Sequence, residues 1–201
     1  MPTLNATKEV IRHCLPYVKG RILDLGAGEA KYKTILKSRG GEYVACDSRK
    51  GKSIDVVCDV ADLPFEPESF DTVVSTQVFE HIKNPFAAAV EIKKVLKIGG
   101  YAIITAPFMI PFHPDPEDNF RFSESGLKEL FEPLGFEIAE SGIYGGFFTV
   151  VYEMIHFSIF NPYFSKSNRF AAAIGKIAGF LDRIFSSEKI YTNSFVVAKK
   201  K

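Results

Sequence analysis

Short apolar runs alternate with amphipathic segments along most of the chain, and this alternation predicts its secondary structure. Most of the apolar runs are followed by Gly, Asp or Ser, which indicates strands that lead into tight turns. We expect strands at Arg21–Leu25, Glu42–Cys46, Ile54–Cys58, Phe70–Ser75, Tyr101–Thr105, Phe136–Tyr144 and Tyr191–Ala198.

Segments with helical spacing of apolar residues fill the stretches between these runs. We expect helices over residues 6–18, 30–39, 84–97 and 123–133, the first ended near Pro16 and the second by Gly40-Gly41. Strands that alternate with helices are typical of βαβ units. The chain therefore predicts an α/β fold with a doubly wound, mainly parallel sheet.

The length of 201 residues suits one domain over 1–201. Residues 146–188 form a long insert before the last strand, rich in Phe and Ile, and we expect two helices in it, separated by Asn161-Pro162. No signal peptide is visible, and no run approaches the roughly 20 apolar residues that cross a bilayer. We therefore expect a cytoplasmic chain.

Three cysteines, Cys14, Cys46 and Cys58, form no CxxC pair. Cys46 and Cys58 fall in apolar, strand-like runs, where a thiol usually behaves as a small hydrophobe. The pattern suits a reducing compartment and argues against a disulfide scaffold or a zinc site, so no metal ligands are expected.

Charge is nearly balanced, with a formal net charge of +1, so no nucleic-acid partner is expected. The charge is unevenly spread, however. Residues 146–201 hold 8 Lys/Arg against 3 Asp/Glu, so the basic excess lies in the C-terminal quarter.

The strongest chemical signal is the run of polar residues at strand ends, at Asp24, Asp47, Asp59 and Ser75. In a doubly wound sheet the carboxyl ends of the strands share one edge, where ligands bind. We therefore expect these sequence-distant residues to form one site.

A Gly-Ala-Gly turn follows the first strand, and Gly26 and Gly28 let the backbone approach a ligand closely. Such turns also occur in dinucleotide-binding and unrelated α/β proteins. A dinucleotide fingerprint needs a small residue where this chain has Lys31, which disfavours a nicotinamide-dependent oxidoreductase. Asp24 and Glu29 suit a cationic ligand better than a phosphate.

Two further acids have candidate roles and simpler alternatives. Asp47 can accept both hydroxyls of a ribose, or it is a solvated turn residue. Asp59 can accept the amino hydrogens of an adenine, with the Val60 N–H meeting a ring nitrogen. Asp62 nearby can equally cap a short helical turn.

Jointly, these segments resemble class I S-adenosylmethionine (SAM)-dependent methyltransferases, in the branch similar to ubiquinone and menaquinone biosynthesis methyltransferases. The matching segments are LDLGAGEA (23–30), CD (46–47), CDVADLPFEPESFDTVVS (58–75), FEHIKNP (79–85) and VLKIGGYAIITAP (95–107). The resemblance implies a Rossmann-like, seven-stranded sheet of order 3-2-1-4-5-7-6 with an antiparallel last strand.

The same resemblance implies SAM as cofactor and S-adenosylhomocysteine as product. It implies contacts to the methionine end, the ribose, the adenine and the region near the sulfonium; the residues concerned are Asp24, Gly26, Ala27, Gly28, Asp47, Asp59, Val60 and Gln77. The acceptor would be a small molecule or lipid-like compound, methylated at oxygen or carbon. A SAM-binding scaffold that has lost catalysis is the alternative.

The proline-rich loop 107–122 should overhang the methyl group. We expect Phe108, Asp118 and Arg121 to contact the substrate, although Asp118 and Arg121 can instead pair to hold the loop's shape. An alcohol or phenol acceptor must lose a proton, and His113 is the first candidate base, with His81 the second.

The insert combines apolar and basic residues, which suggests contact with a membrane or a lipid-linked substrate. The alternatives are a helical cover over the sheet or a homodimer interface. The residues concerned are Phe147, Phe148, Ile155, Phe157, Phe160, Phe164, Lys166, Arg169, Lys176 and Arg183.

Overall fold

The computed structural model describes residues 4–114, 116–160, 169–185 and 187–201. Its centre is a seven-stranded sheet of order β3-β2-β1-β4-β5-β7-β6, the order that the family resemblance implies. Neighbours pair in parallel from β3 to β5, whereas β7 is antiparallel to both β5 and β6. The strands are β1 Ile22–Leu25, β2 Tyr43–Asp47, β3 Val56–Val57, β4 Phe70–Thr76, β5 Leu96–Pro107, β6 Phe136–Tyr144 and β7 Asn193–Lys200.

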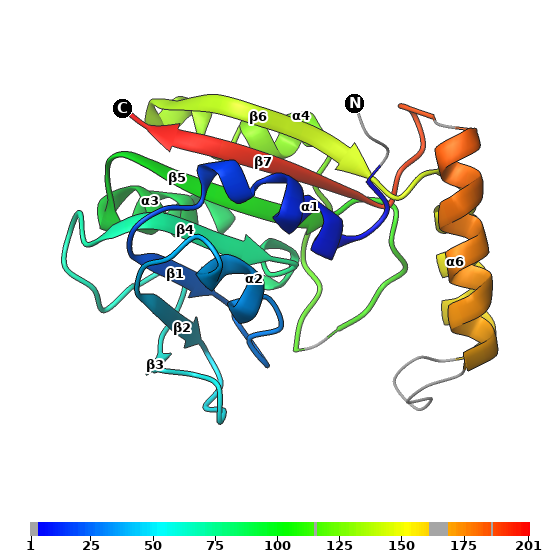
Figure 1. The fold of residues 1–201 in the computed structure, drawn as a ribbon, viewed down its shortest axis with the longest axis horizontal. Coiled ribbons are helices and arrows are strands. Elements are labelled where there is room, and N and C mark those ends of the chain that lie inside the picture. Colours follow the sequence, from blue (N-terminus) through cyan, green and yellow to red (C-terminus); the bar gives the residue numbers. More distant parts are fainter. Residues whose placement is uncertain (1–3, 115, 161–168, 186) are drawn as a thin grey trace.

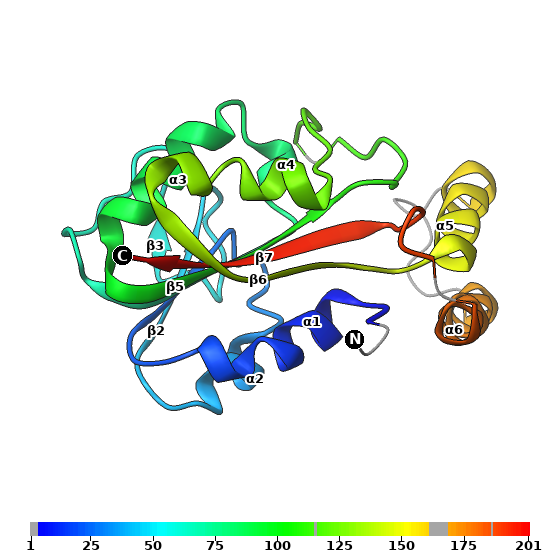
Figure 2. The same ribbon diagram turned by 90° about the horizontal axis from the view of Figure 1, so that it is seen from above.

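Helices cover both faces of the sheet, as expected for a doubly wound fold (Figures 1 and 2). One face carries α1 (Thr7–His13) and α2 (Lys33–Lys37), and the other carries α3 (Pro85–Val95) and α4 (Glu124–Lys128). Each face buries its own apolar cluster against the central strands, which supply wholly buried residues such as Leu23 and Ile22. The sheet is thus buried on both sides, which explains its nearly continuous apolar strands.

The boundaries differ most from the predicted ones around Gly99 and Gly100. The spacing predicts a helix to residue 97, but α3 ends at Val95 and β5 begins at Leu96. Gly99 has a φ of +76°, and the register between β4 and β5 shifts at this point. The two glycines therefore lengthen the strand through an irregular turn instead of ending the helix.

The insert forms the predicted helix pair, α5 (Phe147–Phe160) and α6 (Arg169–Ile184), while Asn161-Pro162 lies outside the described residues. The pair stands beyond the sheet, on the side toward which β1, β4 and β5 point (Figures 1 and 2). Asp182 of α6 is fully buried and accepts hydrogen bonds from the N–H groups of Phe148 and Thr149. This carboxylate therefore caps α5 and joins the two helices. Among the described residues, no helix combines the length and apolar character needed to cross a membrane.

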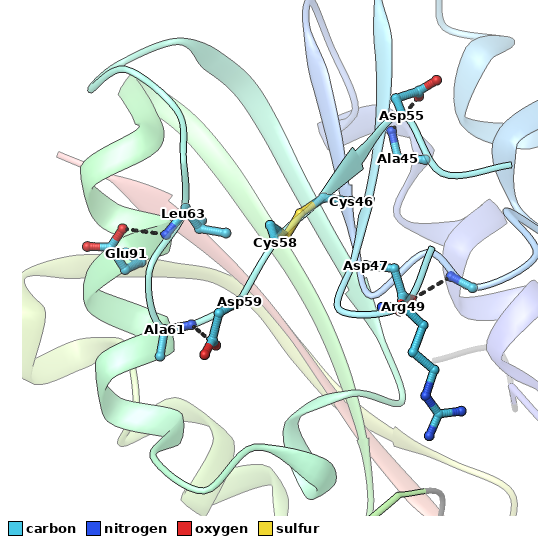
Figure 3. Close-up of a disulfide and its surroundings, with 11 residues drawn as sticks. Ala45, Cys46, Asp47, Arg49, Asp55, Cys58, Asp59, Ala61, Leu63 and Glu91 are labelled. Atoms are coloured by element: carbon cyan, nitrogen blue, oxygen red, sulfur yellow. Dashed lines mark hydrogen bonds between the residues drawn. A yellow bond between two sulfur atoms is a disulfide. The ribbon is translucent and has the colours of Figure 1, made fainter. Parts of the chain in front are cut away.

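The cysteines correct the sequence analysis, which expected Cys46 and Cys58 to be unpaired small hydrophobes. The structure joins them in a disulfide, with their Cα atoms 6.0 Å apart (Figure 3). The cysteine spacing did not predict this disulfide, because the two residues are 12 positions apart in the chain. They come close because β2 and β3 are neighbours in the sheet. Cys14 alone is a free, buried thiol, and the argument for a reducing compartment loses its basis.

We expect Cys58→Ser to lower the free energy of unfolding by about 3 kcal/mol, because the crosslink restricts a short loop in the unfolded chain. Urea denaturation with and without reductant measures this. Reductant should destabilise the natural chain and leave the variant unchanged. If three free thiols are titrated in the denatured, unreduced protein, the crosslink does not exist in solution.

Candidate functional site

The turn after β1 is tied by hydrogen bonds to the end of β2. The N–H groups of Gly26 and Ala27 both donate to the carbonyl oxygen of Cys46, at 2.8 and 3.1 Å. Gly26 has a φ of +74°, and a Cβ there would lie 2.3 Å from Val78. Only glycine therefore fits this position, and the strand leads directly into a closely packed turn.

Asp47 completes this junction from the carboxyl end of β2. Its two carboxylate oxygens accept the N–H groups of Gly28 and Arg49, both at 2.9 Å. A carboxylate oxygen has more than one lone pair, so Asp47 can still accept hydrogen bonds from a ligand. The acid thus shapes the glycine turn and also faces the space beside it.

That space is a cavity of about 700 Å³ at the carboxyl edge of β1, β2 and β4. Its size lies in the range of small-molecule and cofactor sites. Of the residues predicted to bind a cofactor, the structure brings Gly26, Ala27, Gly28, Asp47, Val60 and Gln77 to its wall. Of the four strand-end residues Asp24, Asp47, Asp59 and Ser75, only Asp47 lines this cavity, so the strand-end argument holds for one of them.

Asp24 lies beneath the turn, only 2% exposed. Its carboxylate accepts a hydrogen bond from the Tyr43 hydroxyl at 2.5 Å. Burial raises the pKa of Asp24 to about 6, although the Tyr43 hydrogen bond acts in the opposite direction and the Asp47 charge adds a smaller increase. The chain therefore retains a costly buried acid directly below the glycine turn.

Asp59 and Asp62 are both exposed, and Asp59 does not line the cavity. The Asp59 carboxylate accepts the N–H of Ala61 at 2.9 Å, which forms a local turn (Figure 3). Its neighbour Val60 does line the cavity. The structure thus places Val60, and not Asp59, against the space that a ligand would fill.

Gln77 follows β4 in a left-handed backbone conformation, with a φ of +56°. Its side-chain amide donates to the Thr105 hydroxyl at 3.2 Å and to the Tyr144 hydroxyl at 3.0 Å. Left-handed residues other than glycine are strained and concentrate at functional sites. The contacts to β5 and β6 hold Gln77 in place on the cavity wall.

The two candidate bases come together beside a buried acid. His81 lines the cavity, whereas His113 is not one of the lining residues. The centroids of the two imidazole rings lie 5.5 Å apart. The Glu80 carboxylate is fully buried, and one of its oxygens lies 3.6 Å from Nε2 of His81 and 3.9 Å from Nε2 of His113. Glu80 raises the pKa of His113, opposed by burial.

The loop 107–122 is held by the pair between Asp118 and Arg121, as one of the two predicted alternatives requires. The guanidinium bonds both oxygens of the Asp118 carboxylate and also donates to the carbonyl oxygens of Ile110, Pro111 and Phe120. Arg121 holds the pKa of Asp118 at about 2. Arg121 is thus bonded within the loop, which favours a role in loop shape over substrate binding.

Phe108, the remaining predicted substrate contact, stacks on Tyr191, with ring centroids 4.9 Å apart. Sequence reasoning missed Tyr43 and Tyr144, because nothing in their apolar runs distinguishes them from core residues. It also passed over Glu80, although the adjacent Glu-His pair was a usable signal.

Comparisons with known proteins find a family model and several relatives. A family model described as a methyltransferase domain matches residues 23–104. A protein named as a probable S-adenosylmethionine-dependent methyltransferase of Mycolicibacterium smegmatis is 30% identical over 136 residues, covering 64% of this chain and 49% of that protein. A demethylmenaquinone methyltransferase of Clavibacter sepedonicus is 31% identical over 106 residues, covering 46% of this chain and 43% of the relative.

A solved structure shares the fold: a SAM-dependent methyltransferase from Archaeoglobus fulgidus, with a TM-score of 0.62 at 21% identity, covering 97% of this chain and 95% of the other. The chain spans about half the length of the curated relatives that it matches. The matched segment contains the glycine turn, the acids Asp24 and Asp47, and the Glu80-His81 pair. Residues 23–104 thus match a methyltransferase domain, and the chain's relatives include S-adenosylmethionine-dependent methyltransferases.

Proposed function

We propose that the protein binds SAM in the cavity at the carboxyl edge of the sheet and transfers its methyl group to a small-molecule or lipid-like acceptor. The observation that carries this proposal is the junction of the glycine turn with Asp47 beside a cavity of about 700 Å³. We propose further that residues 1–201 act as one domain and that methylation occurs at oxygen or carbon.

The residues present fit such a cofactor. Asp47 retains acceptor capacity toward ribose hydroxyls, and Val60 lines the wall where an adenine would lie. The buried acid at Asp24 favours a cationic group above it, because a positive charge would offset the cost of burying the carboxylate. No Gly or Ala is present at position 31, where Lys31 lines the cavity, so a dinucleotide fits less well.

When bound, SAM supplies a methyl carbon activated by its sulfonium. The protein's own contribution is to position the acceptor in line with that carbon. The acceptor oxygen or carbon forms the new bond and gives up its proton, while the broken C–S bond leaves its electron pair on sulfur. The proposed proton acceptors are His81, which lines the cavity, and His113, whose ring centroid lies 5.5 Å from that of His81.

We also propose that the α5–α6 pair touches a lipid surface or a lipid-linked acceptor. Several large apolar side chains of α6 are exposed, with Ile177 at 58%, Phe180 at 61% and Ile184 at 56%. The helix α6 stands beyond the edge of the sheet toward which the parallel strands point (Figure 2). Of the residues predicted for this contact, Phe164 and Lys166 lie outside the described residues, as do the side chains of Phe160 and Arg169.

We expect Asp47→Ala to weaken SAM binding at least about tenfold, because hydrogen bonds to a charged carboxylate are worth roughly 1.5–3 kcal/mol. Isothermal titration calorimetry measures this, and Glu66→Gln, which removes an exposed charge outside the cavity, should bind as the natural chain does. Binding of NAD in place of SAM would refute the proposal. SAM binding without S-adenosylhomocysteine formation across an acceptor panel would favour the scaffold alternative.

Asp24→Asn should gain stability relative to the natural chain as pH rises from 4 to 7. A pKa raised to about 6 means that the folded protein holds this proton more tightly than the unfolded chain does. Stability of the natural chain therefore falls through this window, by roughly 1–3 kcal/mol, and the variant lacks that loss. Thermal melts at several pH values measure the difference. A stability difference between the variant and the natural chain that does not change with pH would contradict this prediction. The variant should also bind SAM more weakly.

For the lipid contact, we expect the natural chain to float with vesicles of phosphatidylcholine and phosphatidylglycerol. Phe180→Glu should reduce flotation several-fold, because a charge replaces apolar area at the bilayer interface. Ile98→Glu is the matched control, since Ile98 is 72% exposed on β5, away from the insert. Equal flotation of both variants, or a stable dimer in light scattering that Phe180→Glu dissolves, would refute the lipid contact.

A further inference from the structure

Three potential metal ligands meet at the edge of the cofactor cavity. Glu80 and His81 belong to the 3-10 helix η2 (Phe79–His81), which follows β4, and His113 comes from the loop after β5. One ligand atom from each residue can be chosen such that all lie within 4.8 Å of one another. The strand order brings these two segments together because β4 and β5 are neighbours.

Glu80 is the unusual member of this cluster. Its side chain is fully buried, yet neither carboxylate oxygen has a hydrogen-bond partner among the described residues. Burying an unpaired carboxylate costs several kcal/mol, so such groups are normally hydrogen-bonded, paired or bound to a metal. The two imidazoles, at 3.6 and 3.9 Å, are too far away for hydrogen bonds.

The outer nitrogens of both histidines are already engaged. Nδ1 of His81 bonds the carbonyl oxygen of Glu117, and Nδ1 of His113 bonds that of Pro111 at 3.0 Å. A carbonyl oxygen can only accept, so each Nδ1 carries a hydrogen, and Nε2 is the nitrogen of each ring that lies toward Glu80. Metal-ligating histidines show this same arrangement, with the second nitrogen held by a backbone carbonyl or a carboxylate.

The spacing also suits a shared ion. Bonds of about 2.0–2.2 Å to one ion place neighbouring ligand atoms roughly 3–3.5 Å apart. The observed separations of 3.6 and 3.9 Å need only a small inward movement to reach that value. His113 sits on a loop, and the Asp118 carboxylate, 3.5 Å from its Nδ1, supports the ring from behind.

We propose that Glu80, His81 and His113 bind a first-row divalent transition-metal ion, with Zn²⁺ as the reference case. Two imidazoles and one carboxylate are a usual ligand set for such ions, and they leave positions open for further ligands. His81 lines the cavity, so an open position would face the acceptor.

The role of the ion rests on the proposed methyl transfer. A bound acceptor hydroxyl would lose its proton more readily, because the cation stabilises the resulting oxyanion. The proton passes to solvent, the oxygen forms its bond to the methyl carbon, and the C–S bond breaks toward sulfur. In this arrangement the two histidines hold the ion and do not themselves carry the proton.

The test is a metal titration of the untagged, chelator-treated full chain, without SAM. We expect one Zn²⁺ per chain by calorimetry, and a visible absorption band when Co²⁺ is used instead. His113→Ala should weaken binding by on the order of 100-fold or more, since even the loss of outer contacts to a ligand reaches that size. Glu80→Gln should weaken it similarly.

His13→Gln is the matched control, because His13 also pairs with a carboxylate, Nε2 lying 2.5 Å from Glu140, but without a third ligand. It should bind Zn²⁺ as the natural chain does. Circular dichroism establishes that each variant is folded, and His113→Ala, altered on a loop, keeps the test valid if Glu80→Gln unfolds.

Absence of stoichiometric Zn²⁺, or equal binding by His113→Ala and the natural chain, overturns the site and leaves a protonated histidine as the partner of Glu80. Zn²⁺ binding without SAM binding would leave the site standing and refute the proposed function. SAM binding by a chain that does not bind Zn²⁺ would leave the proposed function standing and refute the metal site.

Discussion

The hydrogen bonds between the turn after β1 and the end of β2 are the contact on which the rest of the site depends. The Cys46 carbonyl oxygen and the Asp47 carboxylate together accept four N–H groups, three of them from the glycine turn. Through its sulfur, Cys46 also holds the segment that leads to Val60. Two adjacent residues thus position the walls of the cavity that come from β1, β2 and the chain after β3.

Buried negative charge is the second constraint on this region. Asp24 lies under the glycine turn, and Glu80 lies beside the histidine that closes the cavity near Gln77. A neutral Tyr43 hydroxyl compensates Asp24 only partly, and Glu80 has no hydrogen-bond donor among the residues described. Neither carboxylate is explained by folding stability, because an apolar residue of similar volume would be cheaper to bury. Both are explained if positively charged groups bind next to them.

The fold could be predicted largely from the sequence because strand periodicity and strand-end polarity are local signals. Each predicted strand is present, and the turn after β1 meets Asp47 at the end of β2. Side-chain direction is not a local signal. The sequence analysis expected both Asp24 and Asp59 at the ligand-binding edge, yet Asp24 turns inward to Tyr43 and Asp59 turns back to the N–H of Ala61.

The same limit explains why Glu80 escaped notice. A Glu beside a His in the turn after a strand resembles a solvated residue, and the segment that folds over it is more than thirty positions away. The N–H groups of Asn119 and Phe120 both donate to the Glu80 carbonyl oxygen, so the loop 107–122 folds back over η2. The Asp118–Arg121 pair that shapes this loop therefore also determines the environment of the buried carboxylate. The loop 107–122 and the Glu80–His81–His113 cluster are consequently one unit. A substitution in this loop changes the surroundings of the Glu80 carboxylate, whether that carboxylate binds a metal ion or a proton.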